Sequence, residues 1–146
     1  MAGRRCGAAA AVLAAVGLTA CGGGSVPPTG STSPVALVGP TWRLVQMQGQ
    51  PVIDGTSVSA EFTSEARVAG KAGCNQYSGS ARTEEGGRLV VGPLASTMMA
   101  CSPQAVMDQE TRYLAALQAA GSFAIDGAEL RLGPTAATTT LVYSSR

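Results

Sequence analysis

SPQAVMDQETRYLAALQAAG, residues 102–121, contains the only convincing helix in the globular part of this chain, which we predict at residues 103–120. Its apolar side chains recur at intervals of three and four residues, which places them on one helical face: Val106, Tyr113, Leu114 and Leu117. Ser102 is suited to capping the helix, Pro103 to its first turn and Gly121 to its end. A single helix with one apolar face needs a surface to cover it, so we expect the rest of the domain to supply a sheet.

Short strand patterns surround this helix in the sequence. Alternating or β-branched segments predict strands at residues 42–48, 57–63, 67–71, 75–81 and 88–91 before the helix, and at 123–126, 129–132 and 138–143 after it. Gly86-Gly87 and Asp126-Gly127 are typical of tight hairpin turns. We therefore predict the α+β class, with an antiparallel β-meander curved into a partly open barrel that one amphipathic helix plugs or flanks.

The N-terminal residues have the composition of an export signal. Arg4 and Arg5 precede an uncharged run from residue 6 to residue 20, which is too short to span the roughly 30 Å hydrocarbon core of a membrane. LTAC at residues 18–21 resembles the lipobox of bacterial lipoproteins, which implies that Cys21 is lipidated and begins the mature protein. The alternative is an ordinary secretory signal with a chance cysteine.

These features divide the chain into three parts. We predict a signal peptide at 1–20, a lipidated cysteine and flexible tether rich in Gly, Ser, Thr and Pro at 21–38, and one domain at 39–146. The protein is therefore expected outside the cytoplasm, anchored by lipid to the cell membrane or the outer membrane. Its expected partners are that membrane and an envelope protein or ligand that the sequence does not identify.

The composition argues against several classes of function. The chain contains no histidine, which excludes Ser-His-Asp and Cys-His catalysis and zinc sites built on histidine. Removal of Arg4 and Arg5 with the signal peptide lowers the basic count from 10 to 8, against 9 acidic residues, so no basic surface remains for nucleic acid. We predict no cofactor, no metal site and no nucleic-acid partner, and we expect that the protein is not an enzyme.

Two cysteines remain once the other two are assigned. Cys6 is lost with the signal peptide and Cys21 carries lipid, which leaves Cys74 and Cys101 in an oxidising compartment that favours a disulfide between them. The alternative is a reactive thiolate at Cys74, for which Lys71 is the only lysine nearby in the sequence and no histidine can act as a base.

Four residues close to these cysteines are candidate contacts for a ligand: Asn75, Tyr77, Met98 and Met99. Asn75 lies between two glycine-containing turns, where it can equally serve as a turn-forming residue. Adjacent residues of a strand point to opposite faces, so at most one methionine can be core if the segment is extended, and the other can offer an adaptable apolar contact. Packing in the core or the loop is the alternative for both.

Glu110 interrupts the apolar face of the predicted helix, four residues after Val106 and three before Tyr113. A carboxylate at such a place must be paired, hydrogen-bonded or protonated. We therefore predict a structural buried charge whose partner is an arginine, a backbone amide or the Trp42 indole. An acid/base role would need a second positioned group, and the sequence does not identify one.

Three segments together resemble the META domain of HslJ-like heat-shock lipoproteins: GCNQYSG at 73–79, STMMAC at 96–101, and Glu110-x-x-Tyr113-Leu114-x-Ala116-Leu117. Two further matches, Trp42-x-Leu44 and Leu130-x-Leu132, occur in the family order, so the resemblance covers about residues 40–144. It implies a small α+β domain that is exported or envelope-associated in bacteria. Family members are linked loosely to heat stress and antibiotic tolerance, and no catalytic residues can be carried over from them.

We therefore expect a non-enzymatic envelope lipoprotein that acts in stress or antibiotic tolerance by binding envelope components. Two alternatives remain open. One is an envelope hydrolase that uses Glu110 with Asp108 or Glu129 as paired carboxylates. The other is an inhibitor or chaperone of a secreted protein, which would bind its client along an exposed sheet edge.

Overall fold

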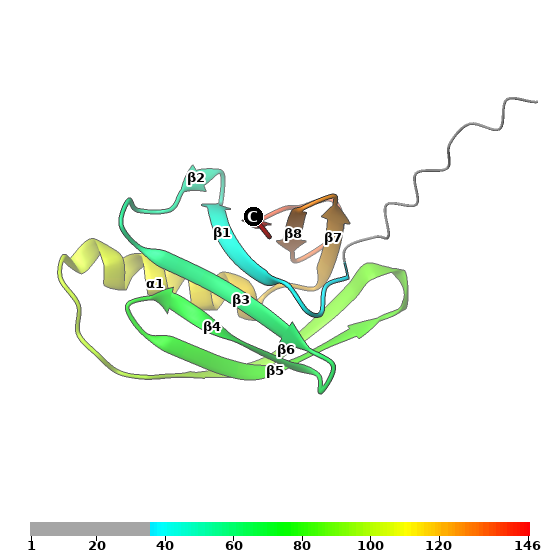
Figure 1. Cartoon of the computed structure of the whole chain (residues 1–146), viewed down its shortest axis with the longest axis horizontal. Coiled ribbons are helices and arrows are strands. Elements are labelled where there is room, and N and C mark those ends of the chain that lie inside the picture. Colours follow the sequence, from blue (N-terminus) through cyan, green and yellow to red (C-terminus); the bar gives the residue numbers. More distant parts are fainter. Residues whose placement is uncertain (1–35) are drawn as a thin grey trace, which may run out of the picture. The chain divides into compact units, whose positions relative to one another are not determined.

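Antiparallel strands form most of the regular structure in residues 36–146, the part of the chain that the computed structural model describes (Figure 1). The strands are β1 (Thr41–Met47), β2 (Gln50–Pro51), β3 (Ser57–Thr63), β4 (Arg67–Gly73), β5 (Gln76–Glu84), β6 (Arg88–Ser96), β7 (Ser122–Asp126), β8 (Glu129–Gly133) and β9 (Leu141–Ser144). A 3-10 turn, η1 (Glu85–Gly87), joins β5 to β6, and the single helix within these residues, α1 (Gln104–Gln118), separates β6 from β7. The predicted signal peptide, Cys21 and nearly all of the tether lie outside the described residues.

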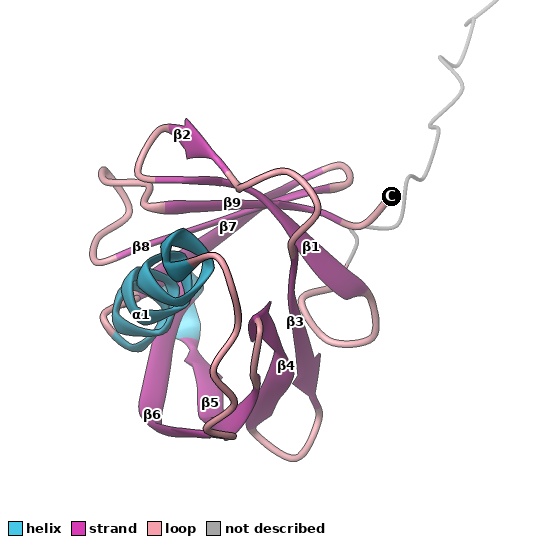
Figure 2. Ribbon diagram, turned by 90° about the vertical axis from the view of Figure 1, so that its left-hand side faces the viewer, coloured by secondary structure: helices cyan, strands magenta, loops and turns pink. Residues whose placement is uncertain are grey.

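The strands close on themselves into an uneven ring. Their order is β2-β1-β3-β4-β5-β6-β7-β8-β9, and β1 also pairs with β9, where Leu44 lies opposite Tyr143. The join between β6 and β7 is the weakest, because Arg88 and Ser122 are the only residues paired there. Figure 2 shows α1 beside this splayed region, close to β6 and β8. The predicted α+β architecture, a partly open barrel with one helix, is confirmed.

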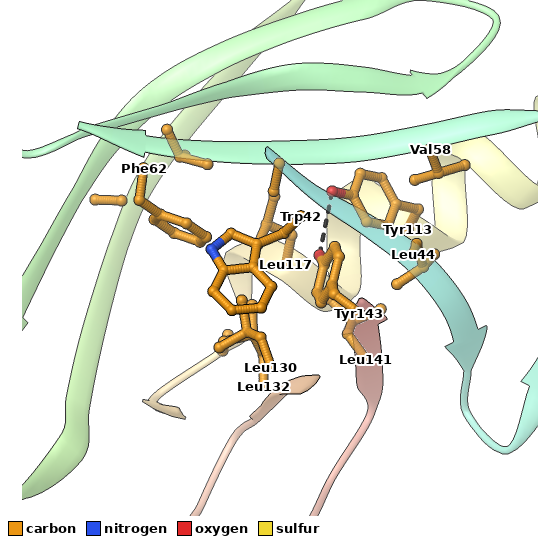
Figure 3. Close-up of a cluster of buried hydrophobic side chains, with 14 of the residues drawn as sticks. Trp42, Leu44, Val58, Phe62, Tyr113, Leu117, Leu130, Leu132, Leu141 and Tyr143 are labelled. Carbon is orange, nitrogen blue, oxygen red and sulfur yellow. Dashed lines mark hydrogen bonds between the residues drawn. The ribbon is translucent and has the colours of Figure 1, made fainter. Parts of the chain in front are cut away.

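The core fills the space between the sheet and α1 (Figure 3). The predicted inward residues of β3 and of the helix are buried or, in one case, half-buried: Val58, Ala60, Phe62, Val106, Tyr113, Leu117 and half-buried Leu114. Trp42 has no exposed surface, and its indole N–H donates to the carbonyl of Leu37 at 2.9 Å. Leu37 is itself part of the core, so packed structure reaches two residues before the predicted domain start at 39.

The start of the helix differs from the prediction. Pro103 occupies the N-cap position with an extended backbone, and no side chain caps the helix, so the predicted cap by Ser102 is wrong. The reason is a shift of one residue: because proline precedes the first helical residue, Ser102 lies too far from the free N–H groups of the first turn. The first turn is closed instead by the N–H of Val106, which donates to the carbonyl of Pro103 at 3.0 Å.

Strand boundaries differ where the prediction relied on apolar alternation. β6 continues to Ser96, beyond the predicted end at residue 91, because its backbone pairs with β5 again at Leu94, Ala95 and Ser96 after a shift in register. The two-residue strand β2 was not predicted. The last strand begins only at Leu141, because the N–H of Thr138 donates to the carbonyl of Thr135 and closes a tight turn ahead of it.

The pairing of β3 with β4 is locally altered at Ser59. The N–H of Lys71 donates to the Ser59 hydroxyl rather than to a carbonyl, at 3.2 Å. The Ser59 carbonyl turns inward and accepts a hydrogen bond from the Tyr77 hydroxyl at 2.9 Å. A Cβ atom at position 70 would collide with that carbonyl, which explains the glycine there.

The three tyrosines of the chain share one buried series of hydrogen bonds. Tyr143 donates to Tyr113 at 3.2 Å, the hydroxyls of Tyr113 and Tyr77 lie 2.8 Å apart, and Tyr77 donates to Ser59. When each hydroxyl donates to the next group, three protons satisfy three acceptors. Burial is the main cause that raises the pKa of each phenol above its ordinary value of about 10.

We expect this tyrosine cluster to make the domain unfold in alkali. An unfolded chain loses its phenol protons near pH 10, whereas the folded domain retains them because its pKa values are raised. The stability that the cluster contributes is therefore complete below about pH 10 and is lost as the pH rises toward the folded-state pKa values. Tyrosinate absorbance and the loss of native Trp42 fluorescence should appear together. Tyrosinate that forms while Trp42 fluorescence stays native would contradict the prediction.

Candidate functional site

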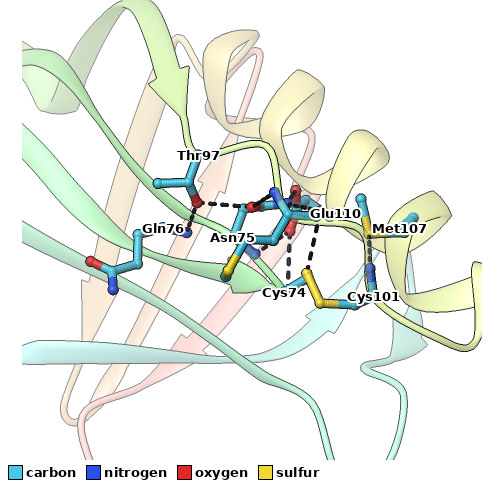
Figure 4. The surroundings of a disulfide bond; sticks show 8 residues. Cys74, Asn75, Gln76, Thr97, Cys101, Met107 and Glu110 are labelled. Atoms are coloured by element: carbon cyan, nitrogen blue, oxygen red, sulfur yellow. Dashed lines mark hydrogen bonds between the residues drawn. A yellow bond between two sulfur atoms is a disulfide. The ribbon is translucent and has the colours of Figure 1, made fainter.

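A disulfide links the turn between β4 and β5 to the loop between β6 and α1 (Figure 4). Cys74 and Cys101 are 27 residues apart in the sequence, and their Cα atoms lie 6.0 Å apart. The predicted pairing is confirmed. We call residues 97–103, which lead from the end of β6 to this disulfide and on to α1, the methionine loop.

Asn75 holds the methionine loop against the β4–β5 turn. Its Oδ1 accepts hydrogen bonds from the N–H of Met99 at 2.7 Å and from the Thr97 hydroxyl at 2.8 Å. Its Nδ2 donates to the Met99 carbonyl at 3.0 Å and to Oε1 of Glu110 at 2.7 Å. Only 1% of Asn75 is exposed, so every polar atom of its side chain is used inside the domain. Asn75 therefore positions the loop from within.

Glu110 fixes the same turn from the helix side. One oxygen, Oε2, accepts the N–H of Asn75 at 2.7 Å and that of Cys74 at 3.1 Å. The other accepts the Asn75 side-chain amide. Within residues 36–146 the salt bridges involve other carboxylates, and the Trp42 indole donates elsewhere, so the backbone-amide partner is the one of the three alternatives that the structure contains. The predicted buried carboxylate is thus stabilised by N–H groups alone.

Gln109, which the sequence analysis missed, ties a second loop to the helix. It is 2% exposed, its Oε1 accepts the N–H of Ile53 at 2.7 Å, and its Nε2 donates to the Thr56 hydroxyl at 3.0 Å. The loop between β2 and β3 is therefore fastened to α1 next to Glu110. Gln109 lies three residues after Val106 and four before Tyr113, so the helical spacing that indicates a buried place for Glu110 is a signal that could also have found Gln109.

The four candidate ligand contacts lie close together but differ in exposure. Asn75 and Tyr77 are buried, and the Tyr77 hydroxyl faces the core rather than the surface. Met98 and Met99 are 98% and 54% exposed. Neither methionine packs in the core, because β6 has ended at Ser96 and Asn75 holds the main chain of Met99 while both side chains face solvent.

The exposed surface of the methionine loop is uncharged. No Asp, Glu, Lys or Arg occurs from residue 89 to residue 107. Large exposed apolar side chains are few in the described residues: Val38, Val45, Met98 and Met99. The two methionines thus form an adjacent apolar pair on a loop that a disulfide and Asn75 hold in place.

The other carboxylates considered for chemistry have partners elsewhere. Asp108 is exposed on α1 and accepts a hydrogen bond from Gln104 at 3.1 Å, while Glu129 on β8 pairs with Arg131. In the described part of the chain, no three residues among His, Cys, Asp and Glu gather in a way that could hold a metal ion. The helix α1 does not have the length and apolar composition needed to cross a bilayer.

The sequence of this chain matches a family model, and its fold resembles solved structures. A family model, that of the META domain, matches residues 35–146. One similar structure, solved by NMR, is 25% identical with a TM-score of 0.57, and the match covers 72% of this chain and 87% of that one. A second NMR structure, from Burkholderia xenovorans, is 24% identical with a TM-score of 0.56 and coverages of 74% and 82%. A search of curated proteins gives no match.

We expect Glu110→Gln to lower the free energy of unfolding by about 1–3 kcal/mol, because an amide nitrogen in place of Oε1 or Oε2 would face N–H groups that need an acceptor. Asp108→Asn is the matched control, since it changes an exposed carboxylate on the same helix and should alter stability by less than about 0.5 kcal/mol. Urea denaturation followed by Trp42 fluorescence measures both. An unchanged midpoint for Glu110→Gln would show that the carboxylate does not hold the turn.

Removal of the disulfide in a Cys74→Ala/Cys101→Ala double variant should destabilise the domain by about 3.5 kcal/mol, the chain-entropy value for a loop of this length. Because Asn75 still binds Met99, the loop should keep its position while the domain is folded. Denaturation gives the first quantity, and hydrogen exchange of the Met99 amide gives the second. Rapid exchange of that amide in the folded double variant would show that the disulfide, and not Asn75, fixes the loop.

Proposed function

We propose, from the fact that this chain belongs to the META domain family, that it is a non-enzymatic lipoprotein of the cell envelope which binds an envelope protein through Met98 and Met99. The binding would support stress or antibiotic tolerance. The observation that carries the proposal is the exposed, adjacent pair of methionines on a loop whose backbone is fixed.

A fixed apolar loop is suited to binding. Side chains that are already presented in one backbone arrangement lose less conformational freedom when a partner covers them. Methionine adds adaptability, because its unbranched thioether fills irregular apolar pockets. The disulfide and the Asn75 hydrogen bonds supply the first property, and Met98 and Met99 supply the second.

The chemistry of the loop favours a protein partner with an uncharged apolar pocket. Surfaces that bind anionic lipid combine apolar side chains with Lys or Arg, and tryptophan or phenylalanine is common among them. The methionine loop has none of these residues, and the nearest charges in the sequence are Arg88 and Asp108. Electrostatic attraction to a charged partner therefore has no basis in this loop.

The contact area also limits the affinity that this surface can reach. Stable protein interfaces bury roughly 800 Å² on each partner, whereas two methionines and their small neighbours offer less. A short-lived contact of this kind becomes effective when both partners are confined to one surface, because confinement raises their effective concentration. The predicted lipid anchor at Cys21 would confine this protein to the membrane surface and so raise its effective concentration for a partner there.

The two alternatives find less support. An inhibitor or chaperone would need a free sheet edge, and the edge of β6 that faces β7 is paired only at Arg88. Pro93 on this strand lacks an N–H, and the strand contains an extra residue where its register with β5 shifts. This edge therefore offers no continuous series of hydrogen-bonding groups to a client strand. For a hydrolase, Glu110 would have to release N–H groups of Cys74 and Asn75 before it could act on a substrate.

Cross-linking in the intact cell envelope tests the proposal. A benzophenone amino acid in place of Met98 should give a discrete adduct with an envelope protein, mapped to an uncharged apolar surface of that protein. Met99→Asp in the same chain should lower the yield about tenfold or more, since a desolvated charge in an apolar contact costs over 1.4 kcal/mol.

The same photoreactive group at Val45 is the matched control, because Val45 is an exposed apolar residue on β1. It should not give this adduct. Equal adducts from both positions, or an adduct with phospholipid alone, would contradict a protein partner at the methionine loop.

A further inference from the structure

We propose that Met98 is an oxidation site through which two-electron oxidants such as hypochlorous acid or peroxide switch off the apolar contact. This inference rests on the proposed function, because it assigns a regulation to the same loop. It follows from three properties of the structure: the accessibility of the sulfur, the absence of competing thiols in the described residues, and a backbone that does not depend on the methionine side chain.

The methionines of the described residues differ widely in exposure. Met98 is 98% exposed and Met99 54%, whereas Met107 is half-buried and Met47 only 6% exposed. The Met107 sulfur is also engaged, since it accepts the N–H of Cys101 at 3.4 Å (Figure 4). An oxidant that arrives from solvent therefore meets Met98 first.

No free thiol in residues 36–146 competes for the oxidant, because Cys74 and Cys101 are already joined. The thioether sulfur of Met98 donates an electron pair to the electrophilic oxygen or chlorine of the oxidant. With hypochlorous acid the net products are a sulfoxide, a proton and chloride, and with hydrogen peroxide they are a sulfoxide and water. Each sulfur loses two electrons and each oxidant gains two.

The fold tolerates this change. The hydrogen bonds that hold the methionine loop involve Thr97, the main chain of Met99 and the N–H of Cys101, and none involves the Met98 side chain. A sulfoxide at position 98 stays in water, so the folded domain buries no new polar group. Oxidation of Met47, by contrast, would place a polar oxygen in the core.

The proposed contact with the partner protein does not tolerate a sulfoxide at position 98. A sulfoxide is a strong hydrogen-bond acceptor, and burying it in an apolar pocket leaves that acceptor unpaired. We expect oxidation to weaken the contact about tenfold or more. The domain itself would remain folded and anchored, with its contact surface converted from apolar to polar.

The experiment treats the full chain in the envelope with limiting hypochlorous acid and follows each methionine by peptide mass spectrometry. A benzophenone amino acid at exposed Ala100 reports the contact without altering Met98. We expect Met98 to be oxidised at least several times faster than Met107 and Met47, the thermal unfolding midpoint to stay unchanged, and the cross-link yield to fall about tenfold. Met98→Leu, which keeps the apolar bulk, should retain most of the cross-link in oxidant.

The outcomes separate this inference from the proposed function. No specific adduct before oxidation would contradict the proposed function itself. A specific adduct that persists after complete oxidation of Met98 would overturn the switch and leave the function intact. The switch would also be wrong if Met107 or Met47 reacted as fast as Met98, or if Met98→Leu lost its cross-link in oxidant as fully as the native sequence.

Discussion

A buried carboxylate that accepts hydrogen bonds only from N–H groups organises the part of the domain where the β4–β5 turn meets α1. Glu110 is 5% exposed, and its hydrogen-bond donors are the main chain of Cys74 and Asn75 and the Asn75 side chain. A charge inside a protein must be solvated by dipoles when no cation reaches it, and the β4–β5 turn supplies those dipoles only in one orientation. Glu110 thereby orients the β4–β5 turn. This turn carries Cys74, which forms the disulfide, and Asn75, which binds the methionine loop.

The local periodicity of apolar residues was sufficient to predict the helix and most of the strands, but not how the strands close into a ring. The alternation of Val58, Ala60 and Phe62 gives the buried face of β3, and the helical spacing gives the buried face of α1. The pairing of β1 with β9 joins segments almost a hundred residues apart, and nothing in either segment specifies its partner. The extension of β6 was missed because the register shifts after Val91, which interrupts the apolar alternation, and small residues such as Ala95 and Ser96 pair beyond it through their backbone.

Two features of the candidate site were predictable, one from the number of cysteines and the other from the spacing of residues on the helix. The pairing of Cys74 with Cys101 followed from assigning the other cysteines, and the burial of Glu110 followed from its place among apolar helix residues. The identity of its donors depended on a turn more than thirty residues away, which a one-dimensional pattern does not contain. Packing of Met98 in the core or the loop, the alternative to a ligand contact, is not what the structure contains, because Asn75 binds the main chain of Met99 and leaves both methionine side chains exposed.

The ring would have a mechanical consequence if the domain is held from its N-terminal side, as the proposed lipid anchor implies. Within residues 36–146, the first core residue is Leu37, and the chain continues from it into β1, which has β3 on one side and β9 on the other. A pull along the chain from that end is applied to a strand that pairs with β3 over residues 41–43 and with β9 over residues 43–47, so two ladders in succession resist the force. The β6–β7 seam, with its single pair of residues, lies elsewhere in the ring and is spared that load.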